Sequence, residues 1–191
     1  MVAIILGNGF EEMEAIVPCD MLRRAEIQTV LAGIGGTQIT GSRGIRVTTN
    51  CTVEELCAED LDMIVLPGGL GGVSEIMQCQ TVLDLVKQIH LAGKYVAAIC
   101  AAPTVLARLG LTDGKRCTCY PGMEEQMGSA QMQEPGQTVV DGNLITATAA
   151  GTAYDFAMHL IAALKSTVAA SSVAKAIVLA SDDKGESYVG I

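Results

Sequence analysis

A cysteine stands where a predicted buried strand gives way to a predicted helix. The run from Lys94 to Ile99 is short and mostly apolar, Cys100 follows it, and Ala101-Ala102-Pro103-Thr104 is typical of a first helical turn, which tolerates proline. Backbone N–H groups at a helix start are unpaired and the helix dipole there favours negative charge, so both stabilise a thiolate. The sequence therefore predicts a reactive thiol with a lowered pKa at Cys100, with an inert core cysteine as the alternative.

The acid best placed to act with this sulfur is Glu14. A helix is predicted from near Glu11, and its first turn carries Glu11, Glu12 and Glu14, which suit the positive end of the helix dipole. Glu11 and Glu12 are most simply interpreted as surface residues. Glu14 lies one turn further in beside apolar neighbours, where burial favours a protonated carboxyl group that can donate a hydrogen bond to a thiolate. A solvent-facing helix residue is the alternative.

Histidine is a common partner of a nucleophilic cysteine, but this chain has only two. His90 falls near the end of a predicted helix, where a cation complements the dipole, and His159 falls in the middle of another. We interpret both as structural residues. A Cys-His dyad is therefore not expected.

The remaining cysteines give little sign of metal binding. The chain has seven, an odd and scattered number, which favours a reducing cytosol over a disulfide framework. Only Cys117 and Cys119 are close in sequence, and no second pair or suitably spaced histidine completes a zinc-binding pattern. We expect no metal site, and we interpret as inert the thiols of Cys19, Cys51, Cys57 and Cys79.

Two glycine-rich turns follow predicted strands. The first, Gly7-Asn8-Gly9-Phe10-Glu11-Glu12, begins like a dinucleotide-binding turn, but carboxylates occupy the place of a pyrophosphate and would repel it. The second, Gly68-Gly69-Leu70-Gly71-Gly72, lacks the Lys-Ser/Thr pair of a phosphate-binding loop. It is either a flexible loop beside the site or a source of backbone N–H donors for an oxyanion. We therefore expect no cofactor.

Strands and helices alternate along the chain, which predicts a mostly parallel sheet with helices on both faces. Ligands of such sheets bind beyond the carboxyl ends of the strands, where Gly7, Gly68 and Cys100 all fall. The expected strands are 2–6, 27–32, 44–48, 62–66, 94–99 and 116–119, with a hairpin of 138–140 and 144–147. The expected helices start near 11, with a kink or break at Pro18, and then cover 53–56, 81–92, 101–109, 151–164 and 168–180, while 70–78 is irregular or helical.

Length and charge limit the class of protein. A chain of 191 residues fits one domain over 1–191, and its polar tail from about 181 is expected to be less ordered. The formal charge of −9, with 12 unclustered Lys and Arg residues, argues against nucleic-acid binding. No run reaches membrane-spanning length and no secretory signal is visible, so we expect a cytoplasmic protein that does not bind membranes.

Four motifs together resemble the ThiJ/PfpI superfamily and, within it, the DJ-one-like branch. In chain order they are Gly9-Phe10-Glu11-Glu12-Met13-Glu14, Leu66-Pro67-Gly68-Gly69, Ala97-Ala98-Ile99-Cys100-Ala101-Ala102-Pro103 and Gly151-Thr152-Ala153-Tyr154-Asp155-Phe156-Ala157. The resemblance covers nearly the whole chain. It implies a flavodoxin-like three-layer α/β sandwich, usually a homodimer.

The resemblance also implies roles for single residues. Cys100 would be the reactive cysteine of a nucleophile elbow and Glu14 its carboxylic-acid partner. The surrounding hydrogen-bond donors would come from Gly68, Gly69 and the backbone N–H of Ala101.

Four further positions belong to the predicted pocket: Arg43, Cys119, Tyr120 and Thr148. Arg43 matches an arginine that lies near the cysteine across the dimer interface in this branch. Tyr120 stands where the family often has a histidine, and Thr148 stands where it has an arginine. These two departures disfavour the protease and glutamine-amidotransferase members of the superfamily, which pair the cysteine with histidine.

Two functions from different classes remain. In the first, a cofactor-independent glyoxalase or deglycase, Cys100 adds to the aldehyde of a small 2-oxoaldehyde or its adduct, and Glu14 moves a proton to give a hydroxy acid. In the second, a redox-responsive or chaperone-like protein, an oxidant converts Cys100 to a sulfinate that hydrogen-bonds to Glu14. A neighbouring thiol, Cys119 or Cys117, could instead capture the oxidised sulfur as a disulfide.

Overall fold

A computed structural model describes residues 1–179. Its centre is a seven-stranded sheet in the order β10-β11-β7-β6-β1-β2-β5, in which all neighbours are parallel except the pair of β10 and β11. The strands are β1 (Val2–Leu6), β2 (Thr29–Gly33), β5 (Cys51–Thr52), β6 (Met63–Leu66), β7 (Tyr95–Ile99), β10 (Thr138–Asp141) and β11 (Leu144–Ala147). The β10–β11 hairpin expected from the sequence is therefore confirmed.

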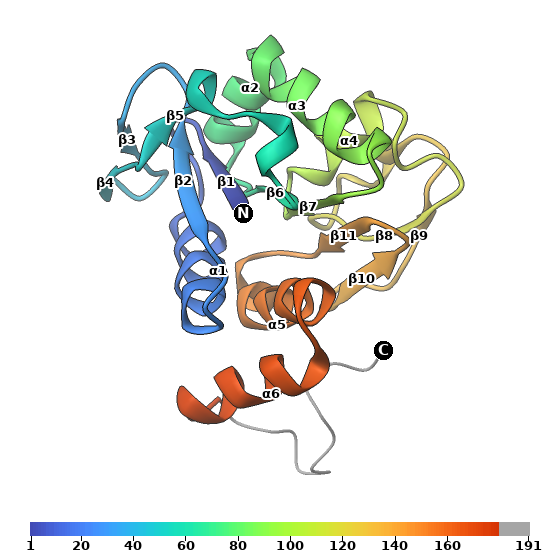
Figure 1. The fold of residues 1–191 in the computed structure, drawn as a ribbon. Helices are drawn as coiled ribbons and strands as arrows, with labels where there is room; N and C mark the ends of the chain where they lie inside the picture. Colours follow the sequence, from blue (N-terminus) through green and yellow to red (C-terminus); the bar gives the residue numbers. More distant parts are fainter. Residues whose placement is uncertain (180–191) are drawn as a thin grey trace.

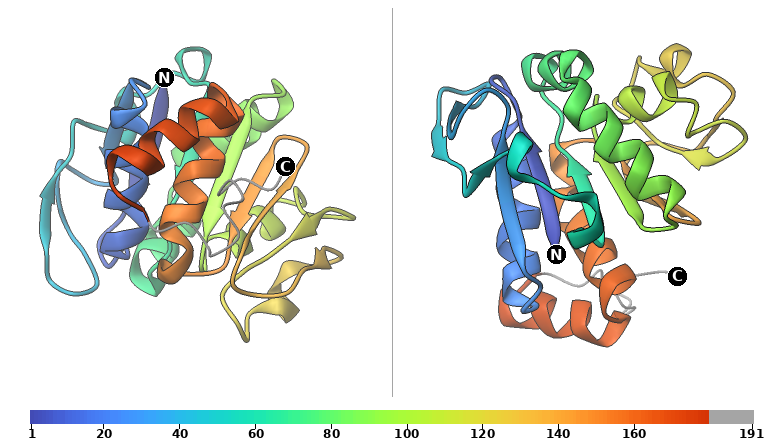
Figure 2. Two further views of the ribbon diagram at one scale, coloured as in Figure 1. Left: turned by 90° about the horizontal axis from the view of Figure 1, so that it is seen from below. Right: turned by 45° about the horizontal axis from the view of Figure 1, so that its top comes forward.

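Helices cover both faces of this sheet (Figure 1). On one face lie α1 (Glu12–Arg24) and α5 (Ala153–Leu164), and α6 (Thr167–Ala176) crosses α5 on the outside (Figure 2). The other face is covered by α2 (Leu70–Gln78), α3 (Gln80–Leu91) and α4 (Pro103–Arg108). Four single turns of 3-10 helix complete the order: η1 (Val53–Glu55), η2 (Ala58–Asp60), η3 (Glu124–Met127) and η4 (Ala150–Thr152).

Strand β1 shows why two helical layers are needed. Its side chains alternate, so that Val2, Ile4 and Leu6 pack in the core cluster that contains α1 and α5 residues, whereas Ala3 and Ile5 pack in the cluster of α2 and α3 residues. A strand that is apolar at every position must be covered on both faces. The flavodoxin-like α/β sandwich predicted from the sequence is confirmed.

Four short strands form two small sheets outside the main sheet, so the strands predicted at 44–48 and 116–119 do not belong to it. β4 (Arg46–Thr48) pairs with β3 (Gln38–Thr40) in a separate antiparallel hairpin, and β8 (Arg116–Cys117) pairs in parallel with β9 (Gln131–Met132). Local patterning indicates a strand but not its partner, because the partner is set by distant segments. The predicted tail from about 181 lies outside the described residues.

The predicted break at Pro18 is wrong, because α1 continues through this residue to Arg24, whereas the alternative of a kink stays a prediction. Proline lacks the N–H that would bond to the carbonyl four residues back, which is that of Glu14. Pro18 itself is buried, and α1 packs along α5 and β2. Tertiary packing of the buried face therefore holds the helix across the missing hydrogen bond.

None of the helices in residues 1–179 has the length and apolar character that a membrane crossing requires.

Candidate functional site

Two parallel strands bring the predicted site together. β6 and β7 are neighbours, with Leu66 opposite Ala98, so Gly68 and Cys100 meet just beyond their carboxyl ends. A Cβ atom built on Gly68 would lie 2.5 Å from Glu14 Oε2, 2.7 Å from Cys100 Cβ and 3.1 Å from Cys100 Sγ. The missing side chain of Gly68 therefore lets Glu14, from α1, and Cys100, from the end of β7, share one space.

Cys100 occupies a strained turn. Its φ angle is +66°, in the left-handed region that residues other than glycine rarely adopt. Its N–H donates to the carbonyl of Ala147 at 2.9 Å, and its carbonyl accepts from the N–H of Tyr120 at 2.8 Å. Strain of this kind costs about 1–3 kcal/mol and persists only where the surroundings fix it. The turn leaves the thiol partly exposed at the edge of the sheet.

Two backbone N–H groups border the Cys100 sulfur. The N–H groups of Gly69 and Ala101 hydrogen-bond to the Cys100 side chain. Helix α4 begins at Pro103 and is only six residues long, so little of a long-helix dipole acts behind Cys100. The electrostatic stabilisation expected from the helix start therefore comes from these two N–H groups.

Glu14 reaches the site from the first turn of α1 and is 1% exposed. Its own N–H donates to the carboxylate of the N-cap residue Glu11 at 2.8 Å, which fixes the start of the helix. The Glu14 carboxyl group accepts from the N–H of Gly68 at 2.8 Å and from the N–H of Ala150. It also hydrogen-bonds to the thiol of Cys100. Ala150 was not predicted from sequence, although it directly precedes the Gly151-Thr152 motif.

Two acids thus share one buried space. Burial raises the pKa of Glu14 to about 7, although the hydrogen bond with Cys100 acts in the opposite direction. Burial and then the charge of Glu14 raise the pKa of the Cys100 thiol to about 12. Two acids in one site release their protons in two steps that belong to the pair. Between about pH 7 and pH 12 the pair therefore carries one negative charge and one proton, and below about pH 7 it carries two protons.

The lowered thiol pKa predicted from the sequence is wrong. The N–H groups of Ala101 and Gly69 do lower the pKa of Cys100, as donors at the junction should, but burial and the nearby carboxylate outweigh them. The sulfur becomes a thiolate near neutral pH only when its proton passes to Glu14. Glu14 is therefore the neighbouring group that is placed to accept this proton.

The model of the DJ-1/PfpI family matches residues 1–163, which is most of the chain. This chain belongs to the DJ-1/PfpI family. Protein dj-1beta of Drosophila melanogaster is 40% identical over 179 residues, covering 93% of this chain and 96% of that protein. The crystal structure of Drosophila melanogaster DJ-1beta matches with a TM-score of 0.89 at 39% identity and covers 94% of this chain and 98% of that one. A Caenorhabditis elegans relative named glutathione-independent glyoxalase DJR-1.2 is 29% identical over 171 residues, or 89% of this chain and 91% of that protein.

Glu12 is not the surface residue that the sequence suggested. It is 6% exposed, and its carboxylate accepts hydrogen bonds from the loop 41–45: from Ser42 Oγ at 3.2 Å, the Arg43 N–H at 2.8 Å and the Ile45 N–H at 3.4 Å. Burial opposes ionisation, but these donors outweigh it and lower the pKa of Glu12. Glu12 therefore fixes the loop that carries Arg43. The Arg43 side chain is exposed on this chain, and its place across a dimer interface stays a prediction.

Tyr120 and Thr148, at the family's histidine and arginine positions, have structural contacts. The Tyr120 side chain is 49% exposed, and its N–H is the donor that holds the Cys100 carbonyl. Thr148 is buried, and its hydroxyl group accepts from the N–H of Gly136 at 2.9 Å and donates to the carbonyl of Gln137 at 3.1 Å. None of these side-chain bonds reaches the sulfur. A pocket role for Tyr120 and Thr148 therefore stays a prediction.

Cys117 and Cys119 pack in a separate small cluster with Met127, whereas Cys100 borders the two main core clusters. Burial raises the pKa of both thiols to about 11. Cys119 donates its weak hydrogen bond to the carbonyl of Tyr120 at 3.5 Å, and all seven cysteines are free. Disulfide capture of an oxidised Cys100 by Cys119 or Cys117 therefore stays a prediction.

The surroundings of His90 differ from those expected, whereas His159 lies within a helix as predicted. His90 lies in the last turn of α3, but burial and the charge of Lys115 lower its pKa, so the cation expected at this helix end is disfavoured. His159 is buried on α5 beside Asp155. Neither is among the groups that hydrogen-bond to Cys100 or Glu14. Within residues 1–179, no three His, Cys, Asp or Glu side chains converge in a way that could hold a metal ion.

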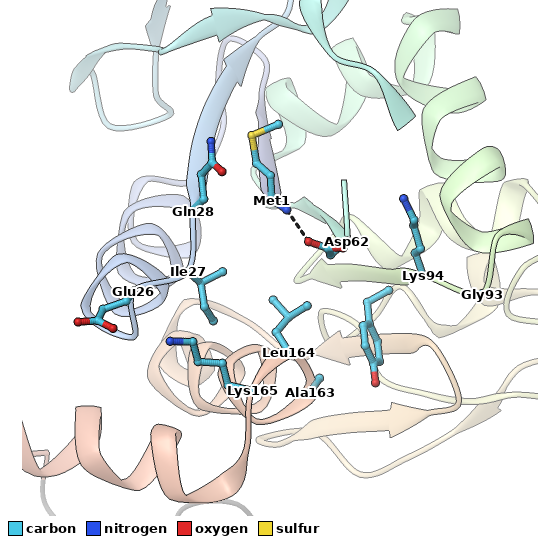
Figure 3. A pocket seen from close by; sticks show the side chains of 11 residues that line it. Met1, Glu26, Ile27, Gln28, Asp62, Gly93, Lys94, Ala163, Leu164 and Lys165 are labelled. Atoms are coloured by element: carbon cyan, nitrogen blue, oxygen red, sulfur yellow. Dashed lines mark hydrogen bonds and ion pairs between the residues drawn. The ribbon is translucent and has the colours of Figure 1, made fainter. Parts of the chain in front are cut away.

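A sizeable cavity lies away from the candidate site, so cavity volume does not identify that site. A cavity of about 580 Å³ lies at the opposite edge of the sheet, where Met1, Gln28, Asp62 and Lys94 precede β1, β2, β6 and β7 (Figure 3). None of the site residues predicted from the sequence lines it. The carboxyl edge is the usual ligand-binding edge of a parallel sheet, and it is the edge where Glu14 and Cys100 meet.

Proposed function

We propose that this protein is a cofactor-independent glyoxalase that converts small 2-oxoaldehydes such as methylglyoxal, or their adducts with amines and thiols, to hydroxy acids. One observation carries the proposal: Glu14 and Cys100 hold one proton between them in a buried space that opens at the sheet edge. The printed name of the Caenorhabditis elegans relative supports the same reaction class.

The first step is addition to the aldehyde. The Cys100 sulfur forms a bond to the aldehyde carbon while its proton passes to Glu14, so the nucleophile needs no histidine. The carbonyl oxygen gains the electron pair and then takes a proton, which gives a hemithioacetal. The N–H groups of Gly69 and Ala101, which border the sulfur, are the available donors for the transient oxyanion.

The second step is an internal rearrangement with Glu14 as the base. Glu14 removes the proton from the carbon that bears the sulfur, the electron pair moves to the neighbouring ketone, and an enediol forms. Return of a proton to the second carbon gives a thioester, and water then cleaves the carbon–sulfur bond to release the hydroxy acid and restore the thiol. The aldehyde carbon is oxidised and the ketone carbon is reduced, so water is the only co-reactant. A carboxyl group with a pKa of about 7 can both accept and return protons at neutral pH.

The test is lactate formation from methylglyoxal by the parent protein and by Cys100→Ala and Glu14→Gln. We expect Cys100→Ala to lose activity on the order of a thousandfold or more, and Glu14→Gln to lose about a hundredfold or more. Cys57→Ala is the matched control, because Cys57 is an exposed thiol away from the core. Turnover that survives in Cys100→Ala overturns the proposal.

We also propose that the active form is a homodimer in which Arg43 approaches the elbow of the partner chain. Support comes from the loop 41–45, which holds Arg43 at the surface and is tied to the turn before α1: the Ser42 N–H donates to the Phe10 carbonyl at 2.7 Å. Sedimentation velocity should give a dimer, and Arg43→Ala should raise KM more than it lowers kcat. A monomer that retains full activity contradicts this arrangement.

A second candidate function is a redox response in which Cys100 is oxidised to a sulfinate. Its support is the partial exposure of this thiol together with the Gly69 and Ala101 donors, which could bind sulfinate oxygens while a protonated Glu14 donates to one of them. Peptide mass spectrometry after graded peroxide should then show Cys100 oxidised before the other six cysteines. Uniform oxidation counts against this function.

A further inference from the structure

A second cavity lies beside β10, the edge strand of the main sheet. Its volume is about 310 Å³, and the residues that line it come from β10, helix α5, strand β8 and the segment before β10. Figure 1 shows β8, β10 and α5 near one another. The residues that line it are Arg116, Gln133, Gln137, Thr138, Val139, Val140 and His159. They supply one guanidinium, one imidazole, two carboxamides and one hydroxyl group, and no carboxylate.

One of these polar groups lacks a partner. Thr138 is 9% exposed, and its buried Oγ1 atom meets the geometric criteria for a hydrogen bond with no group in the described part of the chain, although the Thr138 side chain lies close enough to Asp155 to help lower the pKa of that carboxyl group. The backbone N–H of Thr138, in contrast, is bound to Asp155 Oδ2 at 3.0 Å. Buried hydroxyl groups are nearly always hydrogen-bonded in native proteins. An oxygen atom of a ligand in the cavity would satisfy this one.

His159 is oriented by Asp155 so that one ring nitrogen is left for the cavity. Its Nδ1 atom lies 2.9 Å from the Asp155 carbonyl oxygen and 3.4 Å from Asp155 Oδ1, and because both are acceptors, the ring proton belongs on Nδ1. Nε2 then becomes a donor only in the imidazolium form. Burial opposes that form, but the hydrogen bonds and charge of Asp155 outweigh it and raise the pKa of His159.

Arg116 supplies the second cation. Its Nη2 donates to the Val140 carbonyl at 3.1 Å, and its Nε lies 3.9 Å from Asp141 Oδ2. Asp141 is shared with Lys115, whose Nζ lies 3.3 Å from Asp141 Oδ1. The charged groups around the cavity are therefore the cations of Arg116, Lys115 and His159, against the carboxylates of Asp141 and Asp155. Both carboxylates already have donors of their own and lie outside the lining.

We propose that this cavity binds a small phosphate monoester, with Arg116, His159 and Thr138 holding the phosphate group and Val140 contacting a short carbon chain. A phosphate offers three strong acceptor oxygens and up to two negative charges, which match two cations and an unpaired hydroxyl group better than a single carboxylate does. The cavity volume lies at the small end of the range for small-molecule sites. It is nevertheless larger than inorganic phosphate alone needs.

The chain's two histidines make a direct test possible, because His90 serves as an internal control in the same imidazole NMR spectrum. Glycerol 3-phosphate is titrated into the full-length protein at neutral pH, with inorganic phosphate and lactate in parallel. We expect saturable shifts of the His159 ring signals and none of His90, and binding of glycerol 3-phosphate about tenfold tighter than of either other anion.

Variants separate the site from a general charge effect. Arg116→Gln should weaken glycerol 3-phosphate binding about tenfold or more, and Thr138→Val should weaken it severalfold, because each removes one phosphate donor. Arg108→Gln, which removes an exposed arginine on α4, should leave it unchanged. Absence of a saturable His159 shift at about 10 mM ligand, equal affinity for inorganic phosphate, or equal weakening by Arg108→Gln overturns the proposal.

Discussion

Glu12 and Glu14 lie two residues apart in the first turn of α1, and both are almost fully buried. Burial acts to raise the pKa of each carboxyl group. Glu12 faces two backbone N–H groups and a hydroxyl group of the loop 41–45, and its pKa is lowered. At Glu14 burial dominates and raises the pKa to about 7, although the hydrogen bond with Cys100 acts in the opposite direction. The balance between burial and the donors opposite each carboxylate therefore separates the structural acid from the acid of the candidate site.

The surroundings of Glu12 and Glu14 also have different consequences. The donors around Glu12 come from a loop distant in sequence, so its charge holds a segment of backbone in place. The Glu14 carboxyl group lies beside the Cys100 thiol and has a pKa of about 7, so it can accept and return a proton at neutral pH, which is what the proposed reaction requires. Four experiments test this difference between Glu14 and Glu12.

The largest effect is expected from filling the space between Glu14 and Cys100. In Gly68→Ala the added Cβ overlaps Glu14 Oε2 and Cys100 Cβ, and the displaced pair should lose about a hundredfold or more in kcat/KM for methylglyoxal. Gly151→Ala is the matched control, since a Cβ there meets nothing within 4 Å and no positive φ opposes it. Full activity in Gly68→Ala would mean that the two side chains need not touch.

The pH profile of kcat/KM should report Glu14 alone. Below its pKa of about 7, Glu14 is protonated and cannot take the thiol proton, so activity should fall about tenfold per pH unit on the acid side and level off above pH 7. Glu12→Gln should keep this inflection, because Glu12 is ionised throughout that range. A flat profile on both sides of pH 7 contradicts the base role of Glu14.

The same contrast predicts that Glu14 destabilises the fold at neutral and alkaline pH. The unfolded chain ionises this group near its ordinary pKa of 4.5, whereas the folded chain does so only near 7, so stability falls as pH rises from 4.5 to about 7. Glu14→Gln should therefore raise the free energy of unfolding by about 1–3 kcal/mol at pH 8. Urea unfolding of both proteins at pH 8 and at pH 4 tests this, and a gain that persists at pH 4 would point to another cause.

Glu12→Gln should have the opposite and smaller effect. The folded pKa of Glu12 lies below its ordinary value of 4.5, so its contribution is complete above that pH and is lost as pH falls through the folded pKa. We expect a loss of about 1–2 kcal/mol at pH 8, because charge-assisted hydrogen bonds to the loop 41–45 become neutral ones. The loss should shrink in acid, and a loss independent of pH would show that packing rather than charge is responsible.

The places of Cys100 at the end of a strand and of Glu14 in the first turn of a helix could be predicted because both depend on local signals. β7 is an apolar run that ends at Cys100, and the spacing of the Gly9 to Glu14 motif sets the first turn of α1. Strands β1 and β6 are recognisable for the same reason, since every position is apolar. The fold class followed from this alternation.

What could not be predicted depends on distant contacts. Glu12 looks like a surface residue until the loop that binds it, 31 residues away at Arg43, is in place. The raised pKa of Cys100 results from burial and from the Glu14 carboxylate, neither of which a strand-to-helix pattern reports. His159 and Thr138 likewise come together only when β10 packs beside α5.

The absence of a side chain at Gly68 also limits which relatives can share the proposed reaction. Every coding change at that position adds a Cβ atom to a space that two reactive side chains already fill. A descendant could therefore keep both the cysteine and the glutamate and still lose the reaction through a change in neither. When the proposed function is transferred between relatives, this glycine should therefore count as much as Cys100 and Glu14.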